Sequence, residues 1–153
     1  RGWQCALTVP RELSMRDGKL CQQPVHEIER MRGDCVRAVG GETVEEPGRL
    51  FDVVVSCEGA KMIELEIRKG VFVRYADGML TLDMGDEGYG RDQRSIELSE
   101  LRDLRVLSDT TMVEIFANGG EAALTSRTYS PAVPAMGLHA EGAASMDFYR
   151  LAH

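Results

Sequence analysis

Aromatic residues and asparagine are scarce in this sequence of 153 residues. Aromatics make up 6% of the chain, with a single tryptophan, Trp3, and a single asparagine, Asn118. A sugar-binding surface needs exposed aromatic faces beside hydrogen-bonding groups, because the apolar face of a sugar stacks on a ring. Tyr89, in a glycine-rich stretch, is the one aromatic we expect to be exposed, and so it is the candidate for a weak sugar contact. The composition otherwise disfavours a dedicated sugar site.

The sequence also lacks an excess of basic residues and a long apolar run. Its formal net charge is −7 and its isoelectric point is about 5.0. Nucleic acids and anionic membranes attract basic surfaces, so neither is expected as a partner. No apolar run reaches the ~20 residues that span a bilayer, and no signal segment opens the chain. With 43% hydrophobic residues, the chain is long enough to bury one core and to fold as one domain.

Cysteine and histidine show no metal-binding spacing. The four cysteines stand at positions 5, 21, 35 and 57, without a Cys-x-x-Cys pair. They could form two disulfides, but Cys21 and Cys57 lie within apolar alternation, where a reduced cysteine behaves as a small core residue. Free thiols favour a cytoplasmic protein. The three histidines, His26, His139 and His153, are far apart in sequence, so neither a metal site nor a cofactor is expected.

Turn dipeptides divide much of the chain into short β-rich runs. Asparagine or aspartate followed by glycine tolerates the positive φ angles of a tight hairpin turn. Such pairs predict three hairpins, in which residues 13–16 and 19–23 flank Asp17-Gly18, residues 72–75 and 79–83 flank Asp77-Gly78, and residues 112–117 and 122–128 flank Asn118-Gly119. Within residues 104–128 the pattern predicts three consecutive antiparallel strands. Residues 136–141 and 144–151 are predicted to form a last pair around Gly142.

Two further runs indicate how the strands are buried. Residues 51–57 are almost continuously apolar, as expected for a strand buried on both faces. Residues 62–68 alternate, which places Glu64, Glu66 and Arg68 on one wet face. The only helical signal is at residues 24–31, where Pro24 opens a short segment with apolar residues three apart. These patterns predict an all-β fold, a two-sheet antiparallel β-sandwich with one short helix.

Two motifs resemble those of one enzyme family. Near the start, Trp3 precedes Leu-Thr-Val-Pro-Arg-Glu-Leu at residues 7–13 and Asp-Gly-Lys-Leu-Cys-Gln-Gln-Pro at residues 17–24. Further on, Asp109 precedes Val-Glu-Ile-Phe at residues 113–116 and Asn-Gly-Gly-Glu at residues 118–121. In this order the motifs resemble the C-terminal part of glycoside hydrolase family 32, the invertases, sucrose-6-phosphate hydrolases and fructanases. The resemblance implies a concanavalin-like or lectin-like sandwich with about six strands in each sheet. It assigns structural signature positions to Trp3, Pro10, Arg11, Asp109, Glu114, Phe116, Asn118 and Gly119.

The catalytic motifs of that family are missing. Its members hydrolyse with retention through two carboxylates about 5 Å apart, carried by a separate five-bladed propeller in Asn-Asp-Pro-Asn, Arg-Asp-Pro and Glu-Cys motifs. The lone asparagine is Asn118, no Arg-Asp pair precedes a proline, and no cysteine follows a glutamate. The resemblance therefore implies that residues 1–12 are the exit from a propeller and residues 13–153 a non-catalytic sandwich without catalytic residues.

The same resemblance suggests what such a chain does. It would stabilise the propeller of a β-fructofuranosidase that acts on sucrose or sucrose 6-phosphate, with Trp3 packed at the junction. Without the propeller, an apolar patch would be exposed there. A homodimer is a further expectation. The alternative function is a stand-alone lectin-like carbohydrate-binding module.

Several acidic residues could suggest a catalytic or a metal-binding site. For each of them a structural role is the simpler interpretation. Asp109 and Glu114 are five residues apart, so a regular strand directs them to opposite faces, and turn and strand-surface roles are expected. Glu121 and Arg127 are expected to form an ion pair between strands. Aspartates and a glutamate at positions 83, 86 and 87 lack the regular spacing of a calcium loop, and are interpreted as a solvated connection.

Overall fold

The computed structural model describes residues 5–152, which form an all-β fold. The elements are β1 (Arg11–Arg16), β2 (Lys19–Pro24), η1 (His26–Met31), β3 (Arg32–Val39), β4 (Thr43–Glu45), β5 (Phe51–Ser56), β6 (Met62–Arg68), β7 (Val71–Ala76), β8 (Met79–Asp83), η2 (Gly85–Gly88), β9 (Gln93–Glu97), β10 (Asp103–Ser108), β11 (Met112–Ala117), β12 (Ala122–Arg127), β13 (Ala135–Glu141) and β14 (Ser145–Leu151). Both η elements are 3₁₀ turns, and neither is long and apolar enough to cross a membrane.

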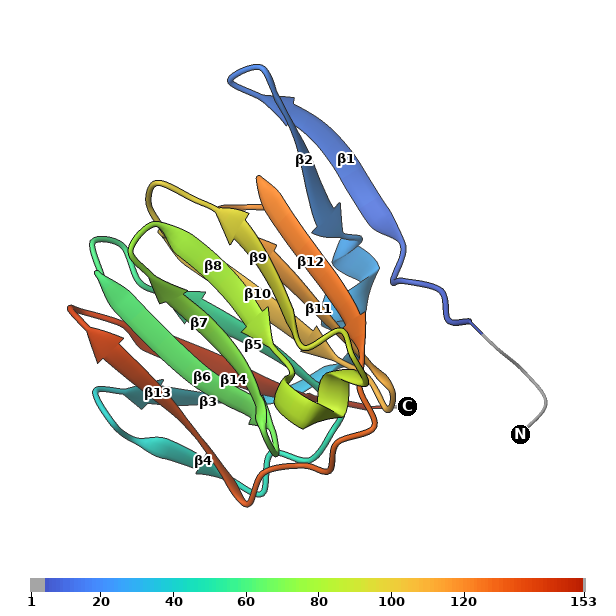
Figure 1. Ribbon diagram of the computed structural model, residues 1–153. Coiled ribbons are helices and arrows are strands. Elements are labelled where there is room, and N and C mark those ends of the chain that lie inside the picture. Colours follow the sequence, from blue (N-terminus) through green and yellow to red (C-terminus); the bar gives the residue numbers. More distant parts are fainter. Residues whose placement is uncertain (1–4, 153) are drawn as a thin grey trace.

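The strands form two six-stranded antiparallel sheets and a separate hairpin. Sheet I has the order β12-β11-β10-β5-β14-β3, and sheet II has the order β4-β13-β6-β7-β8-β9. Strands β1 and β2 pair only with each other and project beyond β12 (Figure 1). The predicted two-sheet sandwich with about six strands in each sheet is confirmed.

The three predicted hairpins are present. Asp17 and Gly18 have φ angles of 48° and 76°, and Asp77 and Gly78 have 51° and 73°, as a two-residue turn with positive φ requires. The third hairpin has a longer connection, because Ala117 pairs with Ala122 and leaves residues 118–121 unpaired. The three strands predicted within residues 104–128 lie side by side as β10, β11 and β12.

The core lies between the two sheets and is built largely from alternate residues of their strands. In β5, Phe51, Val53 and Val55 are fully buried, and the Phe51 ring lies 5.6 Å from that of Phe148. On the outward face Asp52 is fully buried, Val54 is half-buried and Ser56 is exposed, so the predicted burial on both faces holds only for the first part of this strand. Cys57 belongs to the core. All four cysteines are free thiols, and Cys21 is also buried, as expected.

Two expectations about strands are wrong. Strands β13 and β14 do not pair with each other: β13 pairs with β4 and β6, and β14 with β3 and β5. The chain crosses from sheet II to sheet I at Gly142, so hydrophobic alternation identified both strands but not their partners. Arg68 is fully buried and not on the wet face, because the β6–β7 register shifts between Glu66 and Arg68.

The predicted short helix is a 3₁₀ turn, η1. Its apolar residues stand three apart, which fits the three residues per turn of this helix type. No residue of η1 is fully buried. The element connects the β1–β2 hairpin to the edge strand β3 and holds several of the charged residues described below (Figure 1).

Candidate functional site

The signature residues Arg11 and Glu114 meet where the hairpin contacts sheet I. The Arg11 guanidinium donates to Glu114 Oε2 at 2.6 Å and to Thr125 Oγ1 at 2.8 Å, and it lies 5.1 Å from the centre of the Phe116 ring. Glu114 and Phe116 are two residues apart on β11, so both face outward from sheet I. The backbone N–H of Val9 donates to Glu114 Oε1 at 2.7 Å. Both carboxylate oxygens therefore bind the chain just before and at the start of the hairpin.

This geometry corrects the expected strand-surface role of Glu114. Glu114 is 2% exposed and not a surface residue, because the hairpin covers it. Phe116 is buried beneath Arg11 and lies outside the core between the sheets, whereas Phe72 is half-buried under Arg74 on the outer face of sheet II. A charge-assisted hydrogen bond of this kind contributes about 1.5–3 kcal/mol. The pair is a structural clamp.

The hairpin contacts the sandwich at a second place, the loop at Asn118. Asn118 is 3% exposed; its Oδ1 accepts from the Arg102 N–H at 2.8 Å, and its Nδ2 donates to the Glu100 carbonyl at 2.9 Å. The loop fixed in this way presents its backbone to β2, so the Gln22 N–H donates to the Gly120 carbonyl at 2.9 Å. A Cβ on Gly120 would lie 2.0 Å from the Gln22 carbonyl oxygen. Only glycine fits this close approach.

Charged side chains of the hairpin reinforce the same contact. Arg16 donates to the Gly119 carbonyl, and Lys19 forms an ion pair with Glu121. The predicted pair of Glu121 with Arg127 is wrong, because Glu121 lies next to Lys19 and Arg102 and Arg127 contacts Tyr129. Strand alternation could not reveal that a hairpin from another part of the sequence would supply the partner.

The remaining signature residues are scattered. Asp109 is exposed in the turn between β10 and β11, where its Oδ1 accepts from the Thr110 N–H at 2.5 Å. The Pro10 carbonyl accepts from the Val25 N–H at 3.0 Å. Trp3 lies outside the described residues. Tyr89 is 78% exposed, as expected, and follows η2, but it is not the one exposed aromatic, because Tyr129 is 53% exposed. The sugar contact of Tyr89 stays a prediction.

A partly buried ionic cluster beside η1 was missed by the sequence analysis. Asp52 accepts from Arg32 Nε at 2.7 Å and from Arg105 Nη2 at 2.7 Å, and Glu29 of η1 lies 3.5 Å from Arg105. Arg32 also stacks over the Tyr149 ring at 4.3 Å. The cluster borders a polar groove of about 340 Å³ on the outer face of sheet I. The signal in the sequence was Asp52, the single carboxylate in the otherwise apolar run of residues 51–57.

A second missed group is Arg68, which is fully buried. It donates to Ser108 Oγ and to the carbonyl oxygens of Arg49, Asp109 and Ser130. No carboxylate within residues 5–152 forms an ion pair with it. Burial lowers the pKa of the guanidinium to about 10, so it remains charged at neutral pH.

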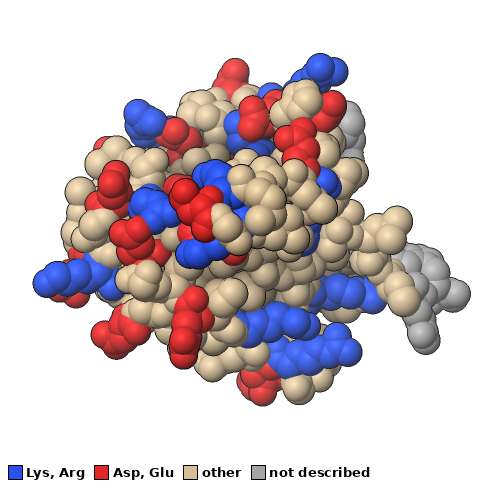
Figure 2. Space-filling model, turned by 90° about the horizontal axis from the view of Figure 1, so that it is seen from above, with Lys and Arg blue, Asp and Glu red and all other residues tan. Residues whose placement is uncertain are grey.

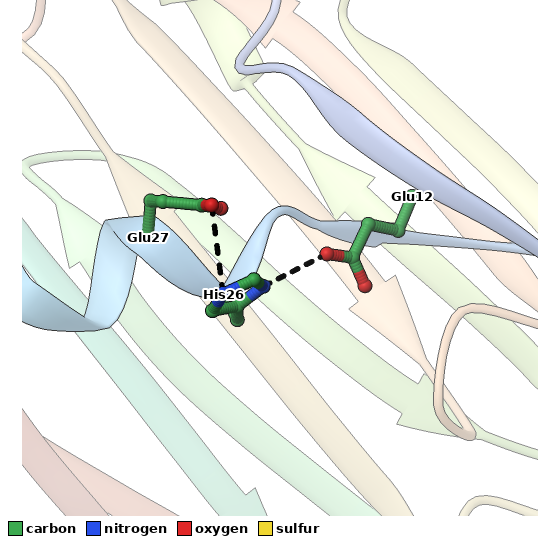
Figure 3. Close-up of side chains that lie close together, drawn as sticks. All are labelled: Glu12, His26 and Glu27. Atoms are coloured by element: carbon green, nitrogen blue, oxygen red, sulfur yellow. Dashed lines mark hydrogen bonds and ion pairs between the residues drawn. The ribbon is translucent and has the colours of Figure 1, made fainter.

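Glu12, His26 and Glu27 form the one cluster within the described residues that has metal-ligating side chains (Figure 3). His26 Nδ1 lies 3.0 Å from Glu12 Oε1, and Nε2 lies 3.5 Å from Glu27 Oε1. The hydrogen bond with Glu12 and the charge of Glu27 raise the pKa of His26. Because metals bind the neutral ring, carboxylates on both nitrogens favour a hydrogen-bonded imidazolium instead. All three side chains are exposed, and we assign no metal to them.

The space-filling view shows no segregation of charge on the face seen from above. Acidic and basic side chains are interspersed there, and uncharged surface extends toward the start of the described chain (Figure 2). An apolar hollow of about 240 Å³ is lined by residues that precede β1, by η1 and by the C-terminal end of the chain. Glu114 also borders this hollow, but both of its oxygens are already paired.

Residues 71–151 match the family model described as the C-terminal domain of glycosyl hydrolases family 32. This match covers more than half of the chain. The chain belongs to glycoside hydrolase family 32. It corresponds to the C-terminal domain of that family, and the catalytic domain is absent from it.

Curated relatives of the family 32 chain are longer enzymes. It is 37% identical to the raffinose invertase of Escherichia coli over 148 residues, which covers 85% of this chain and 30% of the relative. It is 32% identical to a probable sucrose-6-phosphate hydrolase of Vibrio cholerae, covering 94% of this chain and 28% of the relative. The chain therefore spans about 30% of the length of these relatives, in which the domain follows a catalytic domain.

Solved structures support the same fold. Sucrose-6-phosphate hydrolase from Lactobacillus gasseri superposes with a TM-score of 0.79 at 17% identity, covering 93% of this chain and 33% of that one. Exo-inulinase from Aspergillus awamori gives a TM-score of 0.76 at 19% identity, covering 98% and 36%. At this identity the likeness shows that the family 32 chain shares their fold.

Proposed function

We propose that this chain is the non-catalytic accessory sandwich of a retaining glycoside hydrolase that cleaves β-fructofuranosidic bonds in sucrose or sucrose 6-phosphate. The observation that carries the proposal is the match of this chain to the C-terminal third of relatives named as sucrose-6-phosphate hydrolases and invertase. The carboxylates of such an enzyme would lie in the preceding propeller, because their motifs are missing from this sequence.

The role of the chain in that enzyme is mechanical. The Glu114 carboxylate at the hairpin contact is paired with the Arg11 guanidinium and the Val9 N–H, so it holds structure and is not free for acid–base chemistry. The sandwich would cover and stabilise the propeller through an interdomain contact. A linker at residues 1–12, a sandwich at residues 13–153, a homodimer and a cytoplasmic location belong to the same proposal.

An assay of the purified chain tests the non-catalytic role. We expect no release of fructose from sucrose or sucrose 6-phosphate above a buffer blank, and no saturable binding of fructose oligosaccharides in calorimetric titration. Purification-resistant fructose release would contradict the proposal. Saturable binding that is lost in Tyr89→Ala would establish the alternative, a stand-alone lectin-like module, because the Tyr89 ring is 78% exposed.

A further inference from the structure

Exposed apolar side chains gather near the start of the described chain. Leu7 is 92% exposed, Leu13 65%, Met15 66% and Leu20 55%. These four lie within residues 5–24, whereas the rest of the described chain contributes five large apolar side chains in this class. A small protein rarely leaves such a group uncovered unless it binds something.

The hairpin has two different faces. Met15 pairs with Leu20 and Leu13 pairs with Gln22, so Leu13, Met15 and Leu20 share one face, which we call the hairpin patch. The opposite face carries Ser14 and Cys21, and Cys21 is 2% exposed. One face of the hairpin therefore packs toward the sandwich, while the hairpin patch is left open.

Polar contacts fix the hairpin in this orientation. The Arg11–Glu114 clamp holds one end, and the Gln22 N–H bond to the Gly120 carbonyl holds β2 against the Asn118 loop. The hairpin projects beyond β12 (Figure 1), and Leu13, Met15 and Leu20 are each more than half exposed. The patch is thus presented by a braced element and not by a free loop.

The apolar hollow lies beside the segment through which a preceding domain would connect. Leu7 borders this hollow together with Ile28, Met31 and Leu151. Residues 5–10 have no regular secondary structure and lead directly into β1. In the relatives this domain follows the catalytic domain, and the matched segment is about 30% of their length. A domain that precedes residue 1 would be tethered within a few residues of Leu7 and the start of the hairpin.

We propose that the hairpin patch, together with Leu7 and Met31 at the hollow, is the docking surface for the catalytic domain that precedes this domain. This inference rests on the proposed function and specifies where the partner binds. The β1–β2 hairpin is an adapter between the two domains. Arg11 at its base and the backbone of Gln22 bind it to the sandwich, and the hairpin patch offers apolar side chains to the partner.

Hydroxyl-radical footprinting of two polypeptides tests the docking surface. One is the 153-residue chain, and the other is the longer polypeptide encoded by the same reading frame with its upstream residues. Labelling follows exposed area, so we expect Met15 and Leu20 to react about fivefold more slowly in the longer polypeptide. Tyr89 and Val36, which are 78% and 46% exposed and lie outside the surface, should react equally in both.

The outcomes separate the two proposals. Equal labelling of Met15 and Leu20 in a longer polypeptide that hydrolyses sucrose overturns the docking surface and leaves the accessory role intact. Absence of a catalytic domain upstream overturns the proposed function itself. Protection of the hairpin patch in the 153-residue chain alone, increasing with its concentration, assigns the surface to a second copy and overturns the inference.

Two double variants of the longer polypeptide test whether the hairpin patch is part of the docking surface. In the longer polypeptide, Leu13→Ser with Leu20→Ser should restore the labelling of Leu7 and Met31 to the rate found in the 153-residue chain. Val36→Ser with Val39→Ser changes two similarly exposed valines on the edge strand β3 and should leave Leu7 and Met31 protected. The opposite pattern places the interface at β3.

Discussion

At the scale of single residues, Arg68 is a fully buried cation. Its guanidinium joins the ends of several strands through carbonyl and hydroxyl oxygens and has no carboxylate partner within the described chain. Burying a cation lowers the stability of the fold unless its N–H groups find hydrogen-bond acceptors. Each guanidinium nitrogen of Arg68 has such an acceptor. Removing the side chain leaves the acceptors buried and unpaired, which costs more than the net value of the bonds.

We therefore expect Arg68→Met to lower the free energy of unfolding by about 2–4 kcal/mol. The measurement is urea unfolding of the purified chain, followed by circular dichroism. Arg94→Met is the control, because Arg94 is exposed on the edge strand β9, and it should change the value by less than about 0.5 kcal/mol. Equal effects of the two substitutions would show that Arg68 does not hold the strand ends together.

The contact between His26 and Glu12 predicts a dependence on pH. The pKa of His26 is raised above its ordinary value of 6.5, mainly by the hydrogen bond to Glu12, and the pKa of Glu12 is lowered below 4.5 by the same bond. The stabilisation from His26 is complete below pH 6.5 and is lost as the pH rises through its folded pKa. That from Glu12 is present above pH 4.5 and is lost as the pH falls through its folded pKa. The contact is strongest between these limits.

Glu12→Gln should lower the pKa of His26 toward its ordinary value in an NMR titration of the imidazole. Glu27→Gln is the matched control, because it removes the weaker charge effect and keeps the hydrogen bond, so its shift should be smaller. If the Glu27 substitution has the larger effect, the hydrogen bond between Glu12 and His26 is not the main cause.

At the scale of elements, the β1–β2 hairpin depends on the glycine at position 120. Alanine there would clash with the Gln22 carbonyl oxygen, so Gly120→Ala should displace the hairpin from the Asn118 loop. We expect faster amide hydrogen exchange in residues 11–24, with the strands of sheet II unchanged. Gly90→Ala is the control, because Gly90 has a similar φ of 83° and nothing within 4 Å of the added Cβ. If residues 11–24 exchange equally fast in the Gly120→Ala and Gly90→Ala variants, the clash with Gln22 is not the cause, and backbone strain at a positive φ explains the effect.

The sequence predicts individual strands and hairpins far better than it predicts strand partners. Asp17-Gly18 and Asp77-Gly78 identify their turns because positive φ is a local requirement. Gly142 gives the same local signal, yet there the chain passes from one sheet to the other, a choice set by packing over the whole domain. Glu114 shows the same limit: its position on β11 was predictable, but its burial depends on a hairpin about 100 residues earlier in the chain.

At the scale of the whole molecule, the fold predicted from the sequence agrees with the structure because two features of the sequence lead to the same fold. Alternate residues of short strands require two packed sheets, and the signature residues Arg11, Glu114 and Asn118 join the hairpin to one of them. The sequence could indicate the signature but not its physical role. The absence of catalytic motifs could be determined from sequence alone, because it depends on no distance in the fold.

The coding region immediately upstream of Arg1 tests the central claim most directly. We predict a continuous reading frame that encodes a propeller with Asn-Asp-Pro-Asn, Arg-Asp-Pro and Glu-Cys motifs, since the family 32 relatives are about three times as long as the matched segment. A start codon directly before Arg1, or an upstream domain without these motifs, would contradict the claim that this chain is the accessory sandwich of a fructosidase.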